Sequence, residues 1–177
     1  QYLGAYPDAI TGFGSLVAWA DGRRVPDTAV CIMDVGRTRV SYRATLASSF
    51  GGAYTAFQGN NRSLLMKETQ SWLVKESDSA LLGWEVYARK EKVHDETGIA
   101  MVADATKLLQ AGKEPGKEGA ASPEKTALLL AFESFVGSIR EGRAPVCGAR
   151  EGFRATLAAL KANQAVLTGS RVEVTRA

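Results

Sequence analysis

Short hydrophobic runs, separated by glycine, proline, aspartate or asparagine, follow one another through the N-terminal part of the chain. β-Branched and aromatic residues are frequent in these runs, as is typical of β-strands. The pattern predicts strands over residues 10–20, 28–33, 38–46, 50–59, 63–66 and 71–75, with a tight turn at Asn60-Asn61. Because the connections are too short for crossovers, neighbouring strands are expected to pair antiparallel.

Two of these predicted strands differ in their polarity pattern. The strand at 38–46 alternates between an apolar face and a polar face, which carry Val40, Tyr42, Ala44 and Leu46 on one side and Arg39, Ser41, Arg43 and Thr45 on the other. The run Ala29–Met33 is apolar on both faces, as expected for a central strand covered on both sides. Something must therefore cover the second face of the sheet.

Apolar residues recur at the spacing typical of α-helices in the C-terminal part of the chain. Apolar residues predict a helix between 99 and 110, followed by a linker-like segment at 113–119. Ser122 as N-cap and Pro123 at the first helical position predict the start of a second helix, which is expected to end at Gly142. A third helix is predicted from Arg150 to Thr168, with Gly169 as its C-cap. A strand over 171–175 is expected to rejoin the sheet. The segment 82–88 is assigned to a further strand or to a strand entering a loop.

Strands first and helices last is the order of an α+β domain. We therefore expect one domain over residues 1–177, with a largely antiparallel open sheet of about six to eight strands and the C-terminal helices packed on one face. The open face would carry Arg39, Ser41 and Arg43 beside apolar residues of the neighbouring strands. A mixed, uncovered face of this kind usually meets another domain or another copy of the same chain.

Composition and charge narrow the class of protein. The 177 residues are 45% hydrophobic and 23% charged, as in a folded globular domain, and a formal charge of +3 does not indicate a nucleic-acid binder. No apolar run is long enough to predict a membrane span. Cys31 and Cys147 are expected to be reduced, packed thiols, which favours the cytoplasm. Because the chain begins with Gln1 rather than Met, we expect it to be a fragment.

The motifs that could carry chemistry are incomplete. Gly12-Phe13-Gly14 lacks the third glycine of a dinucleotide-binding loop and continues as a strand, so close packing against another backbone or ring is the favoured interpretation. His94, the only histidine, lies in a charged stretch and is expected to be exposed, without further ligands for a metal. No serine lies in a nucleophile elbow. We expect no catalytic, cofactor-binding or metal-binding residue in this chain.

One carboxylate and one group of arginines leave alternatives open. Glu85 follows Trp84, whose ring could desolvate the carboxylate and raise its pKa, although a strand-end salt bridge is favoured. Arg37, Arg39 and Arg43 could bind an anion or a nucleic acid, although a polar sheet face or an oligomer contact is favoured.

Two stretches of the chain resemble the C-terminal domain of the glucose-fructose oxidoreductase / inositol dehydrogenase / MocA family, abbreviated Gfo/Idh/MocA. The first contains Pro26-Asp27-Thr28-Ala29, Phe50-Gly51-Gly52-Ala53-Tyr54 and Gly83-Trp84-Glu85-Val86-Tyr87-Ala88 in that order. The second is residues 135–145, followed by a glycine-rich entry into the last helix. The elements are short, and their order carries the resemblance, which extends over nearly the whole chain.

The resemblance implies a two-domain oxidoreductase in which an N-terminal Rossmann domain, absent from this chain, binds NAD or NADP. It implies hydride transfer with a sugar, cyclitol or related polyol, and a homo-oligomer formed through open sheet faces. The family's nucleotide loop and its catalytic segments precede the part that this chain resembles, so none is carried over. Trp84, Glu85 and Tyr87 are the candidates for a substrate-cleft wall. The alternative is a stand-alone, non-catalytic binding or assembly module of the same fold. In either case we expect neither nucleic acid nor a membrane as partner.

Overall fold

The structure, a computed structural model, describes residues 3–67, 70–101 and 127–175. Two compact units divide the chain: unit 1 comprises Gln1–Phe50 with Ser134–Ala177, and unit 2 comprises Gly51–Glu133. Within the described residues the elements are β1 (Ala9–Ser15), β2 (Thr28–Val35), β3 (Thr38–Thr45), β4 (Tyr54–Gln58), β5 (Arg62–Lys67), β6 (Ser71–Lys75), the 3₁₀ helix η1 (Gly83–Val86), β7 (Lys90–Val93), β8 (Glu96–Met101), α2 (Ala127–Glu141), α3 (Ala149–Thr168) and β9 (Val172–Glu173).

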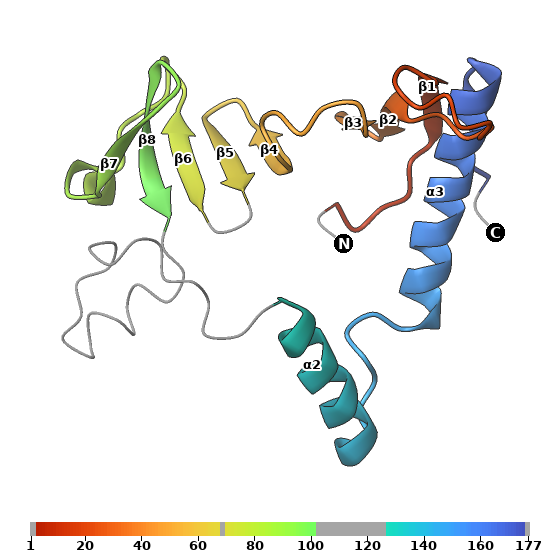
Figure 1. Cartoon of the computed structure of the whole chain (residues 1–177). Coiled ribbons are helices and arrows are strands. Elements are labelled where there is room, and N and C mark those ends of the chain that lie inside the picture. Colours follow the sequence, from red (N-terminus) through yellow and green to blue (C-terminus); the bar gives the residue numbers. More distant parts are fainter. Residues whose placement is uncertain (1–2, 68–69, 102–126, 176–177) are drawn as a thin grey trace. The chain divides into compact units, whose positions relative to one another are not determined.

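The α+β class and the antiparallel pairing are confirmed. The strands form two sheets rather than one, in the orders β3-β2-β1-β9 and β4-β5-β6-β8-β7 (Figure 1), and neighbouring strands in both sheets are antiparallel. Gly51 and Gly52, which lie between β3 and β4, both have positive φ. That conformation interrupts an extended chain, so β4 begins at Tyr54 and not at the expected residue 50.

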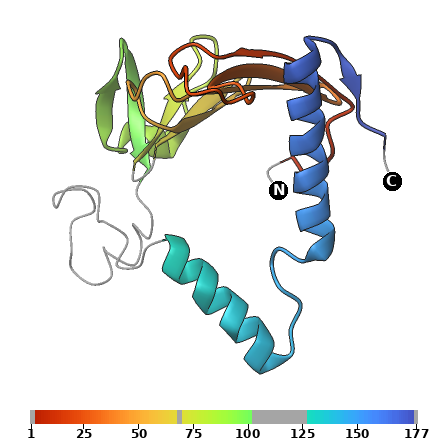
Figure 2. The same ribbon diagram turned by 45° about the vertical axis from the view of Figure 1, so that its right-hand side comes forward.

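Unit 1 has its core between the four-stranded sheet and α3. Figure 2 shows the C-terminal part of α3 beside these strands, while its N-terminal part extends away from them. The buried cluster and the residues packed on it come from β1, β2, α3 and the β9 region: Ile10, Cys31, Met33, Leu157, Ala162, Ala165, Val166, Val172 and Val174. Gly148 and Gly169 flank α3 as its caps, and Gly169 has the left-handed φ of 61° that a C-terminal glycine cap adopts. The predicted last helix and the return of β9 to the sheet are therefore confirmed.

Asp27 explains why the first strand ends earlier than the sequence suggests. Its buried carboxylate accepts hydrogen bonds from the backbone N–H groups of Val17, Ala18 and Trp19, each at 2.9 Å. Burial raises the pKa of Asp27, but these donors outweigh it and bring the pKa from 3.8 to about 2. The chain therefore turns after Ser15, because a side chain and not a neighbouring strand satisfies the N–H groups that follow.

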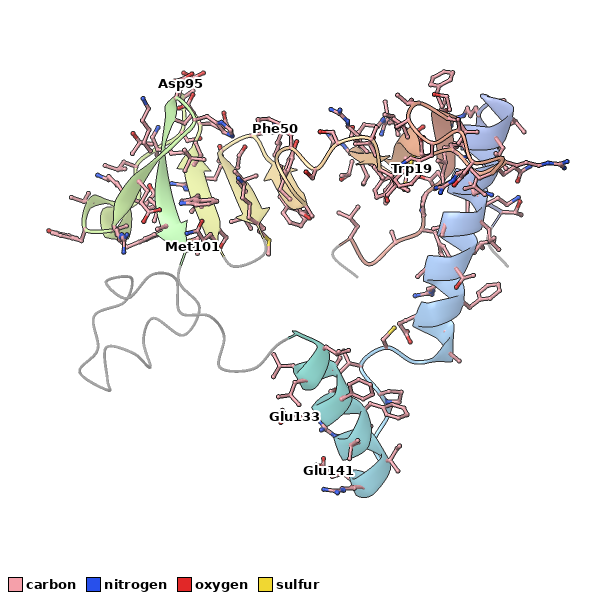
Figure 3. All side chains as sticks on the ribbon, in the orientation of Figure 1. Trp19, Phe50, Asp95, Met101, Glu133 and Glu141 are labelled. Carbon is pink, nitrogen blue, oxygen red and sulfur yellow. The ribbon has the colours of Figure 1, made fainter. Side chains whose placement is uncertain are left out.

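Unit 2 contains the clearest error of the sequence analysis. The prediction of a helix over 99–110 is wrong for residues 99–101, because Glu96–Met101 forms strand β8, which pairs with both β6 and β7. Residues 102–110 lie outside the part of the chain that the structure describes. The hairpin turns at His94-Asp95, with Asp95 at its tip and Met101 at the far end of β8 (Figure 3). His94 is exposed, as expected, and has a φ of 55°. The segment expected to be a strand over 82–88 forms η1 instead.

The two cysteines differ in their exposure to solvent. Cys31 is buried, and burial raises the pKa of its thiol, but Cys147 is exposed, so the expectation of two packed thiols is wrong for Cys147. Both are free thiols. The predicted helix that ends before Gly142 is α2, whose expected N-cap at Ser122 lies outside the described residues. None of the described helices has the length and apolarity to cross a membrane.

Candidate functional site

The first candidate surface is the loop between β6 and β7 in unit 2, which carries the three expected cleft residues. Glu85 is only 1% exposed and lies in η1. Arg62 of β5 donates from Nε to Glu85 Oε1 at 2.6 Å and from Nη2 to Glu85 Oε2 at 3.0 Å. The backbone N–H of Leu82 donates to the same Oε2 at 2.8 Å. The carboxylate is therefore held by an ion pair and a local cap, which is the favoured salt-bridge alternative.

The electrostatics of Glu85 are the reverse of what a general acid needs. The Arg62 guanidinium, together with the Leu82 N–H, lowers the pKa of Glu85 from 4.5 to about 2, although desolvation acts in the opposite direction. A raised pKa was one of the two alternatives from the sequence, and it is wrong. Glu85 is ionised throughout the neutral range, and its buried carboxylate is bound by Arg62 and by the Leu82 N–H. Its role is to fix the loop.

Trp84 and Tyr87 lie on either side of Glu85 along the chain and are not buried with it. Trp84 is 50% exposed and Tyr87 is 91% exposed. The N–H of Tyr87 donates to the carbonyl of Trp84 at 3.3 Å, which closes the 3₁₀ turn between them. The structure thus separates the predicted trio into one anchor, Glu85, and two aromatic side chains that face solvent.

A cavity of about 130 Å³ lies beneath this loop, against the sheet of unit 2. Leu73, Leu81 and Ile99 provide apolar walls, and the exposed Lys90 lies among its lining residues. This hollow is partly open to solvent, and Lys75, Glu85 and Thr97 also line it. The exposed rings of Trp84 and Tyr87 offer a ligand a second surface on the same loop.

The second candidate surface is the face of the unit 1 sheet opposite α3. Strand register aligns Phe13, Val30 and Arg43 in one row, and Thr11, Ile32 and Ser41 in the next. Phe13, Val30 and Ile32 are all exposed, by 67%, 43% and 49%. We call these six residues the open face. It combines an apolar centre with polar groups, as expected for the side of the sheet that carries the arginines.

Arg39 and Arg43, both predicted for this face, have different surroundings. Arg39 lies opposite Asp34 in the register and pairs with its carboxylate at 2.9 Å, and Arg171 binds the same carboxylate at 2.7 Å. Arg171 foremost, and then Arg39, lower the pKa of Asp34. Arg43 has no ion-pair partner within the described ranges. Arg39 is therefore engaged at the end of the face, whereas Arg43 is available to an approaching group. The engagement of Arg39 weakens the alternative of a free arginine cluster for nucleic acid.

Several residues that shape these surfaces could not be identified from the sequence. Arg62 and Lys75, which hold the β6–β7 loop, gave no signal beyond being charged residues at strand ends. Phe13, Val30 and Ile32 were expected only as unspecified apolar neighbours of the arginines, because which side chains share a face depends on register. No group of three or more histidine, cysteine, aspartate or glutamate residues able to hold a metal occurs in the part of the chain that the structure describes.

Several solved dehydrogenase structures contain a region with the same fold as this chain. A levoglucosan dehydrogenase in complex with NADH and L-sorbose superposes with a TM-score of 0.65 at 14% identity, over 97% of this chain and 46% of that one. An Agrobacterium radiobacter oxidoreductase in complex with NAD⁺, L-tartaric acid and magnesium gives 0.61 at 11% identity, over 97% and 44%. The WlbA dehydrogenase of Bordetella pertussis in complex with NADH and UDP-GlcNAcA gives 0.51 at 13% identity, over 97% and 41%.

These likenesses show a shared fold, and the chain spans less than half the length of the enzymes it matches. No family model matches the sequence, and no curated protein matches it either. The α+β class expected from the sequence is confirmed, and the fold is shared with a part of each of these dehydrogenases.

Proposed function

We propose that this chain is the substrate-cleft and oligomerisation domain of an NAD(P)-dependent oxidoreductase of the Gfo/Idh/MocA family. The parent enzyme acts on a sugar, a cyclitol or a related polyol, and a Rossmann domain outside this chain binds NAD or NADP. The observation that carries the proposal is the match of 97% of the chain to less than half of several dehydrogenases whose structures contain NADH or NAD⁺.

The β6–β7 loop supports the assignment of a cleft wall. Trp84 and Tyr87 offer two large aromatic faces to solvent on a loop that is fixed to the sheet by the Arg62–Glu85 ion pair. Ligand sites combine rigid apolar or aromatic surfaces with a few placed polar groups. In this proposal the two rings contact the substrate, Glu85 fixes them, and the proton and hydride transfers take place on residues outside this chain.

The open face supports the assignment of an assembly surface. An exposed apolar centre with arginine and serine beside it fits the core and rim of a protein interface. A second copy of the chain can bind there through a twofold contact, in which each Phe13 and Ile32 meets the same surface of its partner. This use of the face does not depend on the substrate.

Enzyme assays of the complete product of the gene that encodes this chain test the proposed reaction. We expect reduction of NAD⁺ or NADP⁺ in the presence of at least one member of a panel of sugars and cyclitols. Trp84→Ala and Tyr87→Ala should each raise KM for that substrate, whereas Val25→Ala, at an exposed loop position in unit 1, should not. A complete product with neither nucleotide-dependent turnover nor a Rossmann segment would favour the stand-alone module instead.

A further inference from the structure

Arg62 and Lys75 lie directly opposite each other in the register of β5 and β6. Two like charges in this position repel one another and destabilise a sheet unless other groups neutralise them. Neither side chain extends freely into solvent: each is partly buried and binds the same loop, which begins at Glu76 and continues into η1. Acceptor groups of this loop therefore offset the repulsion between Arg62 and Lys75.

Lys75 binds the first half of the loop. Its ammonium group donates to the backbone carbonyls of Glu76, Ser77 and Ser79 at 2.7, 3.2 and 2.9 Å. An ammonium group has three N–H donors, so these carbonyls occupy all of them. The path of the chain from Glu76 to Ser79 is thus fixed around a single charged atom.

Arg62 binds the second half of the loop. In addition to its two bonds with Glu85, Nη2 donates to the carbonyl of Ala80 at 2.9 Å. The planar guanidinium offers its donors in a fixed fork, so it constrains direction as well as distance. Glu85 transmits that constraint to η1 through its bond with the N–H of Leu82.

Apolar packing contributes little to holding this loop. Its large apolar side chains, Leu81, Leu82, Trp84, Val86 and Tyr87, are all exposed, and Glu85 is the loop's only fully buried residue. Buried ion pairs contribute little net stability compared with apolar groups of similar size, and their better-supported use is to select one conformation. The two cations therefore act on the geometry of the loop more than on the stability of the sheet.

We propose that Arg62 and Lys75 are positioning residues that hold Trp84 and Tyr87 in the orientation needed to contact the polyol substrate. This inference rests on the proposed function, because it assigns the aromatic pair to the cleft wall. Neither cation touches substrate: Arg62 acts through Glu85, and Lys75 acts through the carbonyls of the loop.

Fluorine NMR of the chain labelled with 5-fluorotryptophan tests the positioning directly. The three tryptophans are Trp19 in unit 1, Trp72 on β6 and Trp84 on the loop, and single Trp→Phe variants assign their resonances. Arg62→Lys keeps the charge but loses the fork, so we expect the Trp84 resonance to shift and broaden while those of Trp19 and Trp72 stay in place. Lys75→Met should act in the same way, and Arg43→Lys on the open face is the matched control. An unchanged Trp84 resonance, or an equal change at Trp72, would overturn the proposal.

Steady-state kinetics of the complete oxidoreductase provide the second measurement. Arg62→Lys should raise KM for the polyol by about tenfold with little change in kcat. The reason is that displaced Trp84 and Tyr87 side chains would bind the ground state and the transition state of the substrate more weakly by the same amount. If Trp84→Ala raises KM and Arg62→Lys does not, positioning by Arg62 is refuted while the proposed function stands. If the complete protein oxidises no polyol, the proposed function fails, and the positioning role falls with it whatever the Trp84 resonance reports about the loop.

Discussion

Gly14 of β1 lies so close to Val166 of α3 that the helix contacts the strand backbone directly. A Cβ atom added to Gly14 would stand 2.5 Å from Cγ1 of Val166, and one added to Gly12 would stand 3.0 Å from Cγ2 of the same residue. Both separations are shorter than ordinary van der Waals contacts. The Gly-Phe-Gly sequence is therefore a docking site for α3, which confirms the packing interpretation over that of a nucleotide loop.

Substitution of Gly14 by alanine should destabilise unit 1. The added methyl group forces β1 and α3 apart, and overpacking of this kind costs about 1–3 kcal/mol. The free energy of unfolding from urea titration measures the effect, and Val166→Ala in the same chain should restore part of the loss. Gly152→Ala is the matched control: nothing lies within 4 Å of its added Cβ, and alanine in a helix is favoured by up to about 1 kcal/mol. A Gly14→Ala protein as stable as the wild type would contradict the close contact.

Glu85 should make stability depend on pH in the acid range. Its pKa is about 2 in the folded chain and 4.5 ordinarily, because Arg62 and the Leu82 N–H bind the ionised form. A lowered pKa means that the contribution is complete above pH 4.5 and is lost as the pH falls towards 2. Glu85→Gln should be less stable at neutral pH and should show a shallower loss of stability between these values.

Urea unfolding at a series of pH values measures this slope for wild type and variant. Asp27, whose pKa is also about 2, retains its own contribution over nearly the same range, so the slope should decrease without vanishing. Identical slopes in the two proteins would show that Glu85 is not held as an ion pair.

The strand pattern predicted the fold class well, because alternation and short connections are local properties. Strand β6 was predicted at its observed bounds. The observed pairing of β3 with β2 also places Arg39, Ser41 and Arg43 on one face of the sheet, as predicted. The hairpin of β7 and β8 was missed. Its turn uses His94 at positive φ, a conformation that glycine or asparagine usually signals. In addition, Met101 fits a helical period with the apolar residues Val102, Ala105, Leu108 and Leu109 that follow it in the sequence.

The candidate site was predictable only in part, because its geometry depends on contacts distant in sequence. Trp84, Glu85 and Tyr87 were identified as a group from their order along the chain. The division of that group into one buried anchor and two exposed rings depends on Arg62, which lies 23 positions before Glu85. No local pattern specifies that pairing, since it follows from the register of β5 and the path of a loop.

The open face should mediate self-association. Size-exclusion chromatography with light scattering should give at least twice the 18.9 kDa mass of the chain. Ile32→Asp places a charge in the apolar centre of the face and should yield a folded monomer, because an unpaired charge opposes burial. Val25→Asp, at an exposed loop valine, is the control and should leave the mass unchanged. A wild-type chain that is a strict monomer at all concentrations would remove the proposed role of this face.

The proposed function requires this chain to be the part of an oxidoreductase that does not bind nucleotide. Titration with NADH and with NADPH, followed by nicotinamide fluorescence, tests it on two proteins: this chain and the complete product of its gene. The account predicts no saturable change with the chain alone and saturable binding of at least one nucleotide by the complete product. Saturable binding by the chain alone, or none by the complete product, would contradict it.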